Sequence, residues 1–188
     1  MRLGSWNQVS YSSVSIGAAH GFELPSGSTG TVIRFSTAAI NSTSRYALYL
    51  SNSDSNTVTG SYLSNPAGNG AFLSGDADYN TISLSTMTSN AAGSAALFIV
   101  GADSNTVTGS YLSNPAGDGA RLAAGADYNT IIRSTMTSSA VGRYALYIAA
   151  SSSNTIVDSY VQGSAAAFIS GSTGTVIGGS VFIATNTT

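Results

Sequence analysis

The peptide SNTVTGSYLSNPAG occurs twice in this chain without a single change, at Ser55–Gly68 and at Ser104–Gly117. A period of 49 residues therefore dominates the sequence, and such self-similarity is typical of repeat architectures. Alignment on the tripeptide Asn-Thr-Val or Asn-Thr-Ile splits the period into an odd and an even segment of 24 or 25 residues, although the seventh segment is shorter. The resulting segments, all within a single domain 1–188, are 6–29, 30–54, 55–78, 79–103, 104–127, 128–152, 153–173 and the partial segment 174–188.

Each segment has the pattern of short β-strands. Ser, Thr, Val, Ile and Tyr are frequent, and apolar residues alternate with others in stretches such as NTVTG and ALYLS. Gly and Asn-Pro punctuate these stretches, as expected of turns. Three strands per segment, each lying on its copy in the next segment, predict an all-β fold: a single-stranded parallel β-helix, or β-solenoid, of about eight coils.

Three apolar columns recur from coil to coil and are predicted to face the interior. The first column is Val9, Val32, Val58, Ile82, Val107, Ile131, Ile156 and Val176. The second column is Val14, Leu63, Met87, Leu112, Met136, Val161 and Val181. The third consists of the pairs Leu48 and Leu50, Ala71 and Leu73, Leu97 and Ile99, Ala120 and Leu122, Leu146 and Ile148, and Ala167 and Ile169.

Polar residues recur in columns of their own. We expect an asparagine ladder at a bend, with the asparagines in the left-handed conformation and Gly30 and Gly174 replacing them in two coils. The ladder comprises Asn7, Asn56, Asn80, Asn105, Asn129 and Asn154. A column of inward serines is expected to form a chain of hydroxyls, and it comprises Ser12, Ser61, Ser85, Ser110, Ser134 and Ser159.

The recurrent (S/Y)-N-T-(V/I) motif in coils of this length resembles the right-handed parallel β-helix repeats of the pectate-lyase-like superfamily. The nearest resemblance is to Asn-rich repeat proteins of bacterial surfaces and to carbohydrate-binding β-helix domains. It extends from Trp6 to Ile183 and rests on stacking residues. The superfamily includes lyases, hydrolases, epimerases, tailspikes and adhesins, so the resemblance implies a fold without selecting an activity. It also implies an extracellular or cell-surface location if the parent protein is a surface repeat protein.

The acidic residues do not form a catalytic pattern. Enzymes of the superfamily use either a carboxylate cluster for Ca²⁺ with a basic residue or two or three carboxylates at catalytic spacing. Here Asp54, Asp78, Asp103 and Asp127 each precede the Asn-Thr motif, so we expect them to stack. Turn N–H groups or, as the weaker alternative, bound Ca²⁺ would offset their repulsion. We therefore expect a non-enzymatic protein without catalytic residues or cofactors, and these four aspartates are the weak calcium candidates.

Composition limits the partners that this chain can have. Only 7% of its residues are charged and its net charge is −2, so no basic patch indicates nucleic-acid binding. The longest apolar stretch, Ala95–Val100, is far too short to insert into a membrane. The single histidine, His20, is expected to be a solvated residue near the rod end rather than a catalytic base.

An outward aromatic column is the main candidate for a binding surface. Strand alternation predicts that it consists of Tyr49, Phe72, Phe98, Arg121, Tyr147 and Phe168. Such a column can meet a protein partner or stack on sugar rings. The leading expectation is a structural or adhesive segment of a longer bacterial surface protein, and the alternative is a carbohydrate-binding or polysaccharide-acting β-helix.

Two further expectations concern other surfaces. A column of outward threonines resembles the ice-binding face of insect antifreeze proteins, which makes ice binding a second alternative. Its members are Thr31, Thr57, Thr81, Thr106, Thr130, Thr155 and Thr175. The sequence predicts no capping α-helix at either end of the β-helix. Exposed strand edges at these ends are therefore expected to promote homo-oligomerisation or end-to-end association.

Overall fold

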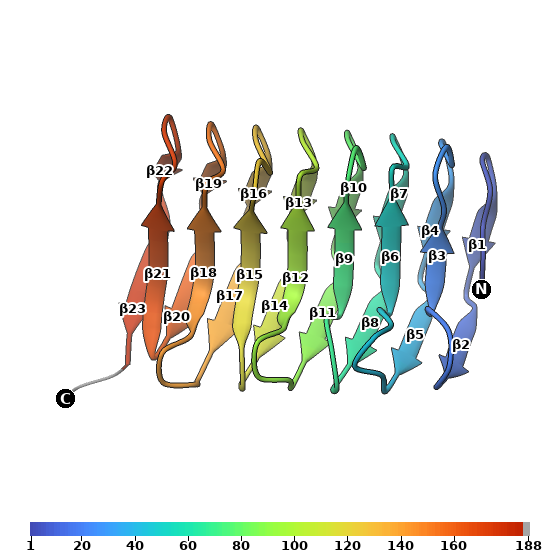
Figure 1. Cartoon of the computed structure of the whole chain (residues 1–188), viewed down its shortest axis with the longest axis horizontal. Coiled ribbons are helices and arrows are strands. Elements are labelled where there is room, and N and C mark those ends of the chain that lie inside the picture. The colour runs from blue at the N-terminus through green and yellow to red at the C-terminus, as the bar shows by residue number, and fades with distance from the viewer. Residues whose placement is uncertain (186–188) are drawn as a thin grey trace.

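The structure is a computed structural model that describes residues 1–185 and shows a rod of stacked coils (Figure 1). The first strand, Gln8–Ser10, and the last described strand, Val181–Ala184, lie at opposite ends of its long axis. All elements in the described part are strands, so it contains no helix that is long and apolar enough to cross a membrane. Residues 186–188 of the partial segment 174–188 lie outside the described part.

Three parallel sheets run along the rod, one on each side of the coil. Sheet 1 contains β1 (Gln8–Ser10), β4 (Val32–Arg34), β7 (Thr57–Thr59), β10 (Thr81–Ser83), β13 (Thr106–Thr108), β16 (Thr130–Ile132), β19 (Thr155–Val157) and β22 (Val176–Gly178). Sheet 2 contains β2 (Ser13–Ile16), β5 (Thr37–Ile40), β8 (Tyr62–Asn65), β11 (Thr86–Ser89), β14 (Tyr111–Asn114), β17 (Thr135–Ser138), β20 (Tyr160–Gly163) and β23 (Val181–Ala184). Sheet 3 contains β3 (Phe22–Leu24), β6 (Leu48–Ser51), β9 (Ala71–Ser74), β12 (Ala95–Val100), β15 (Asp118–Ala123), β18 (Tyr144–Ala149) and β21 (Ala165–Ser170).

The predicted all-β solenoid with three strands per coil is confirmed. Two sheets have eight strands and the third has seven, so seven turns are complete and the eighth has two strands in the described part. The number of coils is therefore close to the expected eight. Adjacent strands pair in register, which places each residue on its counterpart in the next coil, about 4.8 Å away.

The inward columns fill the interior with apolar side chains, and those between the two end coils are almost completely buried. In sheet 1 the column is Val9, Ile33, Val58, Ile82, Val107, Ile131, Ile156 and Ile177. In sheet 2 it is Val14, Ala38, Leu63, Met87, Leu112, Met136, Val161 and Phe182. The pairs predicted for sheet 3 pair in register as expected, and Phe22 and Leu24 extend them by one coil.

The prediction for the second coil is wrong by one residue. Ile33, not Val32, continues the column of sheet 1. The cause is that Gly30 is not the counterpart of an asparagine: the register places it on Ser55, so that Thr31 takes the asparagine position. Alignment of Gly30-Thr31-Val32 with the Asn-Thr-Val motif therefore places the residues of this coil one position out of register.

The last coil shows the same shift. Ile177 rather than Val176 continues the interior of sheet 1, and Phe182 rather than Val181 continues that of sheet 2. Val176 and Val181 instead lie on the outer faces, where 55% and 52% of their surface is exposed.

The prediction that the asparagines adopt the left-handed conformation is wrong. At the corner that leads into sheet 1, the residue directly before each asparagine has this conformation instead. Its φ is 57° at Ser55 and 56° at Tyr79, Ser104, Tyr128 and Ser153. In the second coil Gly30 has this conformation with φ 65°, and the ring of Trp6 lies where a Cβ would be. Because the corner is made one residue earlier, each asparagine side chain is left facing the interior.

The inward serines alternate with the backbone rather than bonding to one another. The Ser61 N–H donates to Ser85 Oγ at 3.1 Å, and the Ser85 N–H donates to Ser110 Oγ at 3.2 Å. Each hydroxyl in turn donates to a carbonyl two residues earlier in its own coil, as Ser85 does to Ser83 O at 2.8 Å. The expected chain of hydroxyls is therefore a ladder of hydroxyls and amides that ties successive coils together.

Candidate functional site: an aromatic stripe on sheet 3

The outward column of sheet 3, which we call the aromatic stripe, consists of Tyr49, Phe72, Phe98, Arg121, Tyr147 and Phe168. All six side chains are half-buried and alternate with the inward aliphatic residues. Ring centroids are 5.8 Å apart for Tyr49 and Phe72, 5.2 Å for Phe72 and Phe98, and 5.1 Å for Tyr147 and Phe168. These spacings are in the range of favourable aromatic pairs, so the rings form two stacked runs, one from Tyr49 to Phe98 and one from Tyr147 to Phe168.

Arg121 joins the two aromatic parts of the stripe. Its guanidinium carbon lies 5.1 Å from the ring centroid of Phe98 and 4.9 Å from that of Tyr147. Both distances suit a cation–π contact, and the planar guanidinium replaces a ring in the column. Within residues 1–185 the buried Arg121 Nε atom has no hydrogen-bond partner, and the two rings provide the contacts that hold this side chain.

Two tyrosines that the sequence analysis missed widen the stripe. The ring centroid of Tyr46 lies 4.5 Å from that of Phe72, and that of Tyr144 lies 5.1 Å from that of Phe168. The signal in the sequence was the peptide Tyr-Ala-Leu-Tyr, which occurs once in each of the two coils concerned.

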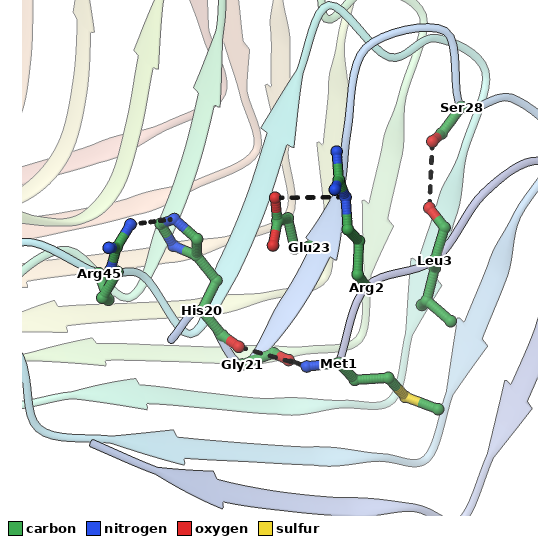
Figure 2. Close-up of polar contacts among 8 residues, drawn as sticks. All are labelled: Met1, Arg2, Leu3, His20, Gly21, Glu23, Ser28 and Arg45. Atoms are coloured by element: carbon green, nitrogen blue, oxygen red, sulfur yellow. Dashed lines mark hydrogen bonds and ion pairs between the residues drawn. The ribbon is translucent and has the colours of Figure 1, made fainter. Parts of the chain in front are cut away.

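His20 packs against this aromatic band, contrary to the expectation of a solvated residue. It is 7% exposed, and its ring centroid lies 4.6 Å from that of Tyr49. Its Nδ1 accepts the Tyr46 N–H at 3.0 Å. Its Nε2 lies 3.4 Å from Arg45 Nη1 (Figure 2). Burial lowers the pKa of His20, and Glu23 opposes this shift only in part.

The asparagines form a buried ladder. Asn80 Oδ1 accepts the Asn56 N–H at 2.8 Å, and Asn105 Oδ1 accepts the Asn80 N–H at 2.9 Å. The same contact joins Asn105 to Asn129 and Asn129 to Asn154, at 2.8 Å in both cases. Each side chain therefore satisfies a backbone donor that the corner of the preceding coil leaves without a strand partner.

The aspartates also accept backbone N–H groups from adjacent coils. Asp54 Oδ1 accepts the Asp78 N–H at 3.0 Å, Asp78 Oδ1 that of Asp103 at 2.6 Å, and Asp103 Oδ1 that of Asp127 at 2.8 Å. Partial burial raises the pKa of Asp78, an effect that the Asp103 N–H opposes. Within residues 1–185 no three acidic or histidine side chains converge as a metal site.

The threonine column on the outer face of sheet 1 is shorter than expected. Thr57, Thr81, Thr106, Thr130 and Thr155 lie in register. The placement of Thr31 and Thr175 in this column is wrong, because the one-residue shift moves both to the asparagine position and puts valines in the column.

A row of exposed tyrosines on sheet 2 was also missed. Tyr62, Tyr111 and Tyr160 are 44%, 43% and 36% exposed. They alternate with Thr86 and Thr135 in the register of the sheet. The signal was the dipeptide Ser-Tyr, which occupies the same place in the third, fifth and seventh segments, where the segments between and before them have Ser-Thr or, in the first segment, Ser-Ser.

Comparison with known structures gives likenesses that are too weak to argue from. A protein titled glycoside hydrolase superposes with a TM-score of 0.47 at 11% identity, over 94% of this chain and 39% of that protein. HetL, a pentapeptide repeat protein involved in heterocyst differentiation regulation from the cyanobacterium Nostoc, has a TM-score of 0.19 at 15% identity, over 98% of this chain and 94% of HetL. This chain thus spans well under half of the glycoside hydrolase. No curated protein matches its sequence.

The family model for the right-handed β-helix region matches residues 26–187, which is most of the chain. Its match agrees with the parallel coils, the in-register columns and the three sheets described above. The fold is shared by enzymes and non-enzymes, so membership does not assign an activity. The chain belongs to the right-handed β-helix family.

Proposed function

We propose that this chain is a non-enzymatic structural or adhesive β-helix segment whose aromatic stripe contacts a partner. The observation that supports the proposal is the unbroken, half-exposed column from Tyr49 to Phe168, with Arg121 between two rings. Aromatic residues and arginine are the residue types that contribute most to protein contact surfaces. Their side chains here are already held by their neighbours, so little conformational entropy is lost on binding.

The polar columns support a structural role. Asparagine, serine and aspartate side chains all accept N–H groups of adjacent coils. These side chains therefore stabilise the stacking along the whole rod. A long surface protein built from such repeats is the setting that we propose, since its function would be to present the stripe on a rigid support.

Carbohydrate binding is the second candidate. Two aromatic surfaces favour it, namely the aromatic stripe and the tyrosine row of sheet 2. In the tyrosine row, exposed rings alternate with threonine hydroxyl groups, and no charged residue lies in the same column. Tyrosine faces stack on sugar rings while hydroxyl groups satisfy the sugar hydroxyls. The threonine face supports ice binding less well, since valines take the place of threonine at both ends of the column and shorten it to five residues.

The stripe is tested with Phe72→Ser/Phe98→Ser, and Tyr62→Ser/Tyr111→Ser is the matched control that removes two rings from sheet 2. Light scattering gives the mass of each protein and a glycan array gives its sugar binding. We expect a mass above that of the monomer, reduced by the stripe variant and unchanged in the control. Sugar binding by the natural chain that either variant loses would favour the second candidate and would identify the surface that binds the sugar. A stripe variant identical to the natural chain in both measurements would refute a contact role for the stripe.

A further inference from the structure

The outer face of sheet 2 differs from the other two faces in its charge. Within the described part of the rod, none of its strands, from β2 to β23, contains a charged residue. Sheet 1 has Arg34 in β4, and sheet 3 has Glu23 in β3 and Arg121 in β15. A charged polymer that bound to sheet 2 would lose hydration without gaining an ion pair, so this face fits an uncharged partner.

The tyrosine row lies along this face at a regular spacing. Tyr62, Tyr111 and Tyr160 occupy the same register position in every second coil, and Thr86 and Thr135 occupy it in the coils between. Adjacent strands are about 4.8 Å apart, so the rings recur about every 9.6 Å and the row spans about 19 Å. Each of the five strands has a described neighbour on both sides, so the row belongs to the body of the rod.

A column of hydrogen-bonding groups runs beside the tyrosine row. It is the other outward column of sheet 2 and consists of Ser64, Thr88, Ser113, Thr137 and Gln162. Hydroxyl and amide groups both donate and accept hydrogen bonds, as sugar hydroxyl groups do. The face therefore offers rings that can stack on sugar faces and, next to them, groups that can bond to sugar hydroxyls.

One ring of the row is already held by a neighbour in this second column. The Tyr160 hydroxyl donates to Gln162 Oε1 at 3.1 Å, and Gln162 is the next outward residue of the same strand, β20. The hydrogen bond orients the ring while 36% of the surface of Tyr160 stays exposed. A ring that is ordered before binding loses little conformational entropy when a ligand stacks on it.

We infer that the tyrosine row binds an uncharged β-1,4-linked glucan chain that lies along the rod. The inference rests on the second candidate function above and names its surface and its ligand. In such a chain successive sugars advance by about one coil spacing and alternate in orientation, so equivalent sugar faces recur every two coils. Tyr62, Tyr111 and Tyr160 then stack on the first, third and fifth sugars, and the two threonines face the sugars between. An α-1,4-linked glucan is curved and does not follow a straight row.

Isothermal titration calorimetry with oligosaccharides tests the length, the linkage and the charge of the ligand. We expect cellohexaose, which reaches all three rings, to bind at least about tenfold more tightly than cellobiose, which covers one ring at a time. Maltohexaose, which has α-1,4 linkages, and a β-1,4-linked hexaglucuronate, which has a carboxylate on every sugar, should each bind at least about tenfold more weakly than cellohexaose. If any of these three ligands matched cellohexaose, or if cellohexaose did not bind, the inference would be overturned.

Variants of the central tyrosine test the surface. Tyr111→Ala removes the middle ring and should weaken cellohexaose binding about tenfold, whereas Tyr111→Phe keeps the ring and should stay within about twofold of the natural chain. Tyr128→Ala is the matched control, because Tyr128 is 64% exposed at the corner before sheet 1 and lies outside the row. Equal weakening by the two alanine variants, or by neither, would contradict the assignment of the site.

This inference and the functions proposed above can fail separately. Tyr111→Ala leaves the aromatic stripe intact, and the stripe variant Phe72→Ser/Phe98→Ser leaves the tyrosine row intact. Cellohexaose binding that only Tyr111→Ala weakens would support the inference whatever mass light scattering gives. Binding that only the stripe variant weakens would place the glucan on sheet 3 and overturn it. Binding of other sugars on the glycan array without binding of cellohexaose would also overturn it, while the second candidate function would stand.

Discussion

The two 49-residue blocks of the chain, 55–103 and 104–152, have the same interior and different exteriors. The large aliphatic side chains that the strands direct into the interior are identical between them. The identical pairs are Val58 and Val107, Leu63 and Leu112, Ala71 and Ala120, Leu73 and Leu122, Ile82 and Ile131, Met87 and Met136, Leu97 and Leu146, and Ile99 and Ile148. On the outer face of sheet 3, by contrast, Phe72 corresponds to Arg121 and Phe98 to Tyr147. The comparison indicates that the interior aliphatic side chains determine the fold of the coil, whereas the residues on the outer face can vary.

The largest effects are expected where the two blocks are identical. Leu73→Ala and Leu122→Ala each remove a fully buried side chain at equivalent interior positions. Each change should lower the free energy of unfolding by about 2–5 kcal/mol, because it leaves a cavity that neighbouring coils cannot close. Urea unfolding followed by circular dichroism measures both. Costs that differ by more than about 1 kcal/mol would show that the blocks are not equivalent inside.

The asparagine ladder should give the next largest effect. Asn80→Ala and Asn129→Ala each leave a buried N–H of the preceding coil without its acceptor. The expected loss of unfolding free energy is about 1–3 kcal/mol in each block. Asn90→Ala, which changes an exposed turn residue, serves as the control and should cost less than about 0.5 kcal/mol. If the ladder variants were as mild as the control, the side chains would contribute little to stacking.

Repeat period and strand alternation were sufficient to predict the solenoid, its three sheets and the outward direction of the stripe. They failed where one residue changes the register, because Gly30 matches the motif in sequence but matches Ser55 in space. They also missed Tyr46 and Tyr144, since these lie where a turn enters sheet 3 and alternation no longer gives the direction. The burial of His20 depends on rings from the next coil, which a single segment does not reveal.

Substitutions on the outer face should lower stability less than those in the interior. Variants of Arg121 show whether the planar shape or the charge of its guanidinium group stabilises the stripe. Arg121→Ala removes contacts with two rings and should lower the free energy of unfolding by about 1–2 kcal/mol. Arg121→Phe recreates the residue that the first block has at this position, and it should restore most of that loss by stacking between Phe98 and Tyr147. Thermal unfolding of the three proteins gives the ranking. A phenylalanine variant as unstable as the alanine variant would mean that the positive charge, rather than the planar shape, is required.

The smallest expected effect on stability comes from one position in the register of sheet 3, where different coils have different hydrogen-bond acceptors. His20, Asn69 and Asp118 each accept the N–H of the residue that follows in the next coil: Nδ1 at 3.0 Å, Oδ1 at 2.7 Å and Oδ1 at 3.0 Å. His20→Asn should therefore keep the hydrogen bond to the Tyr46 N–H while removing the only histidine. The difference between the two proteins therefore reports how the protonation of the His20 ring affects stability.

The pH dependence follows from the lowered pKa of His20. Below the unfolded pKa of 6.5 the unfolded chain binds more protons at this residue than the folded chain does, so stability should fall as the pH falls through 6.5. Urea unfolding of both proteins between about pH 7.5 and pH 5.5 should show a decline in the natural chain that is smaller in His20→Asn, by less than about 1 kcal/mol. Carboxylates such as Asp78 titrate in both proteins and cancel in the difference. Parallel pH curves would show that the ring stays solvated enough to protonate as freely as in the unfolded chain, which would contradict its packing against Tyr49.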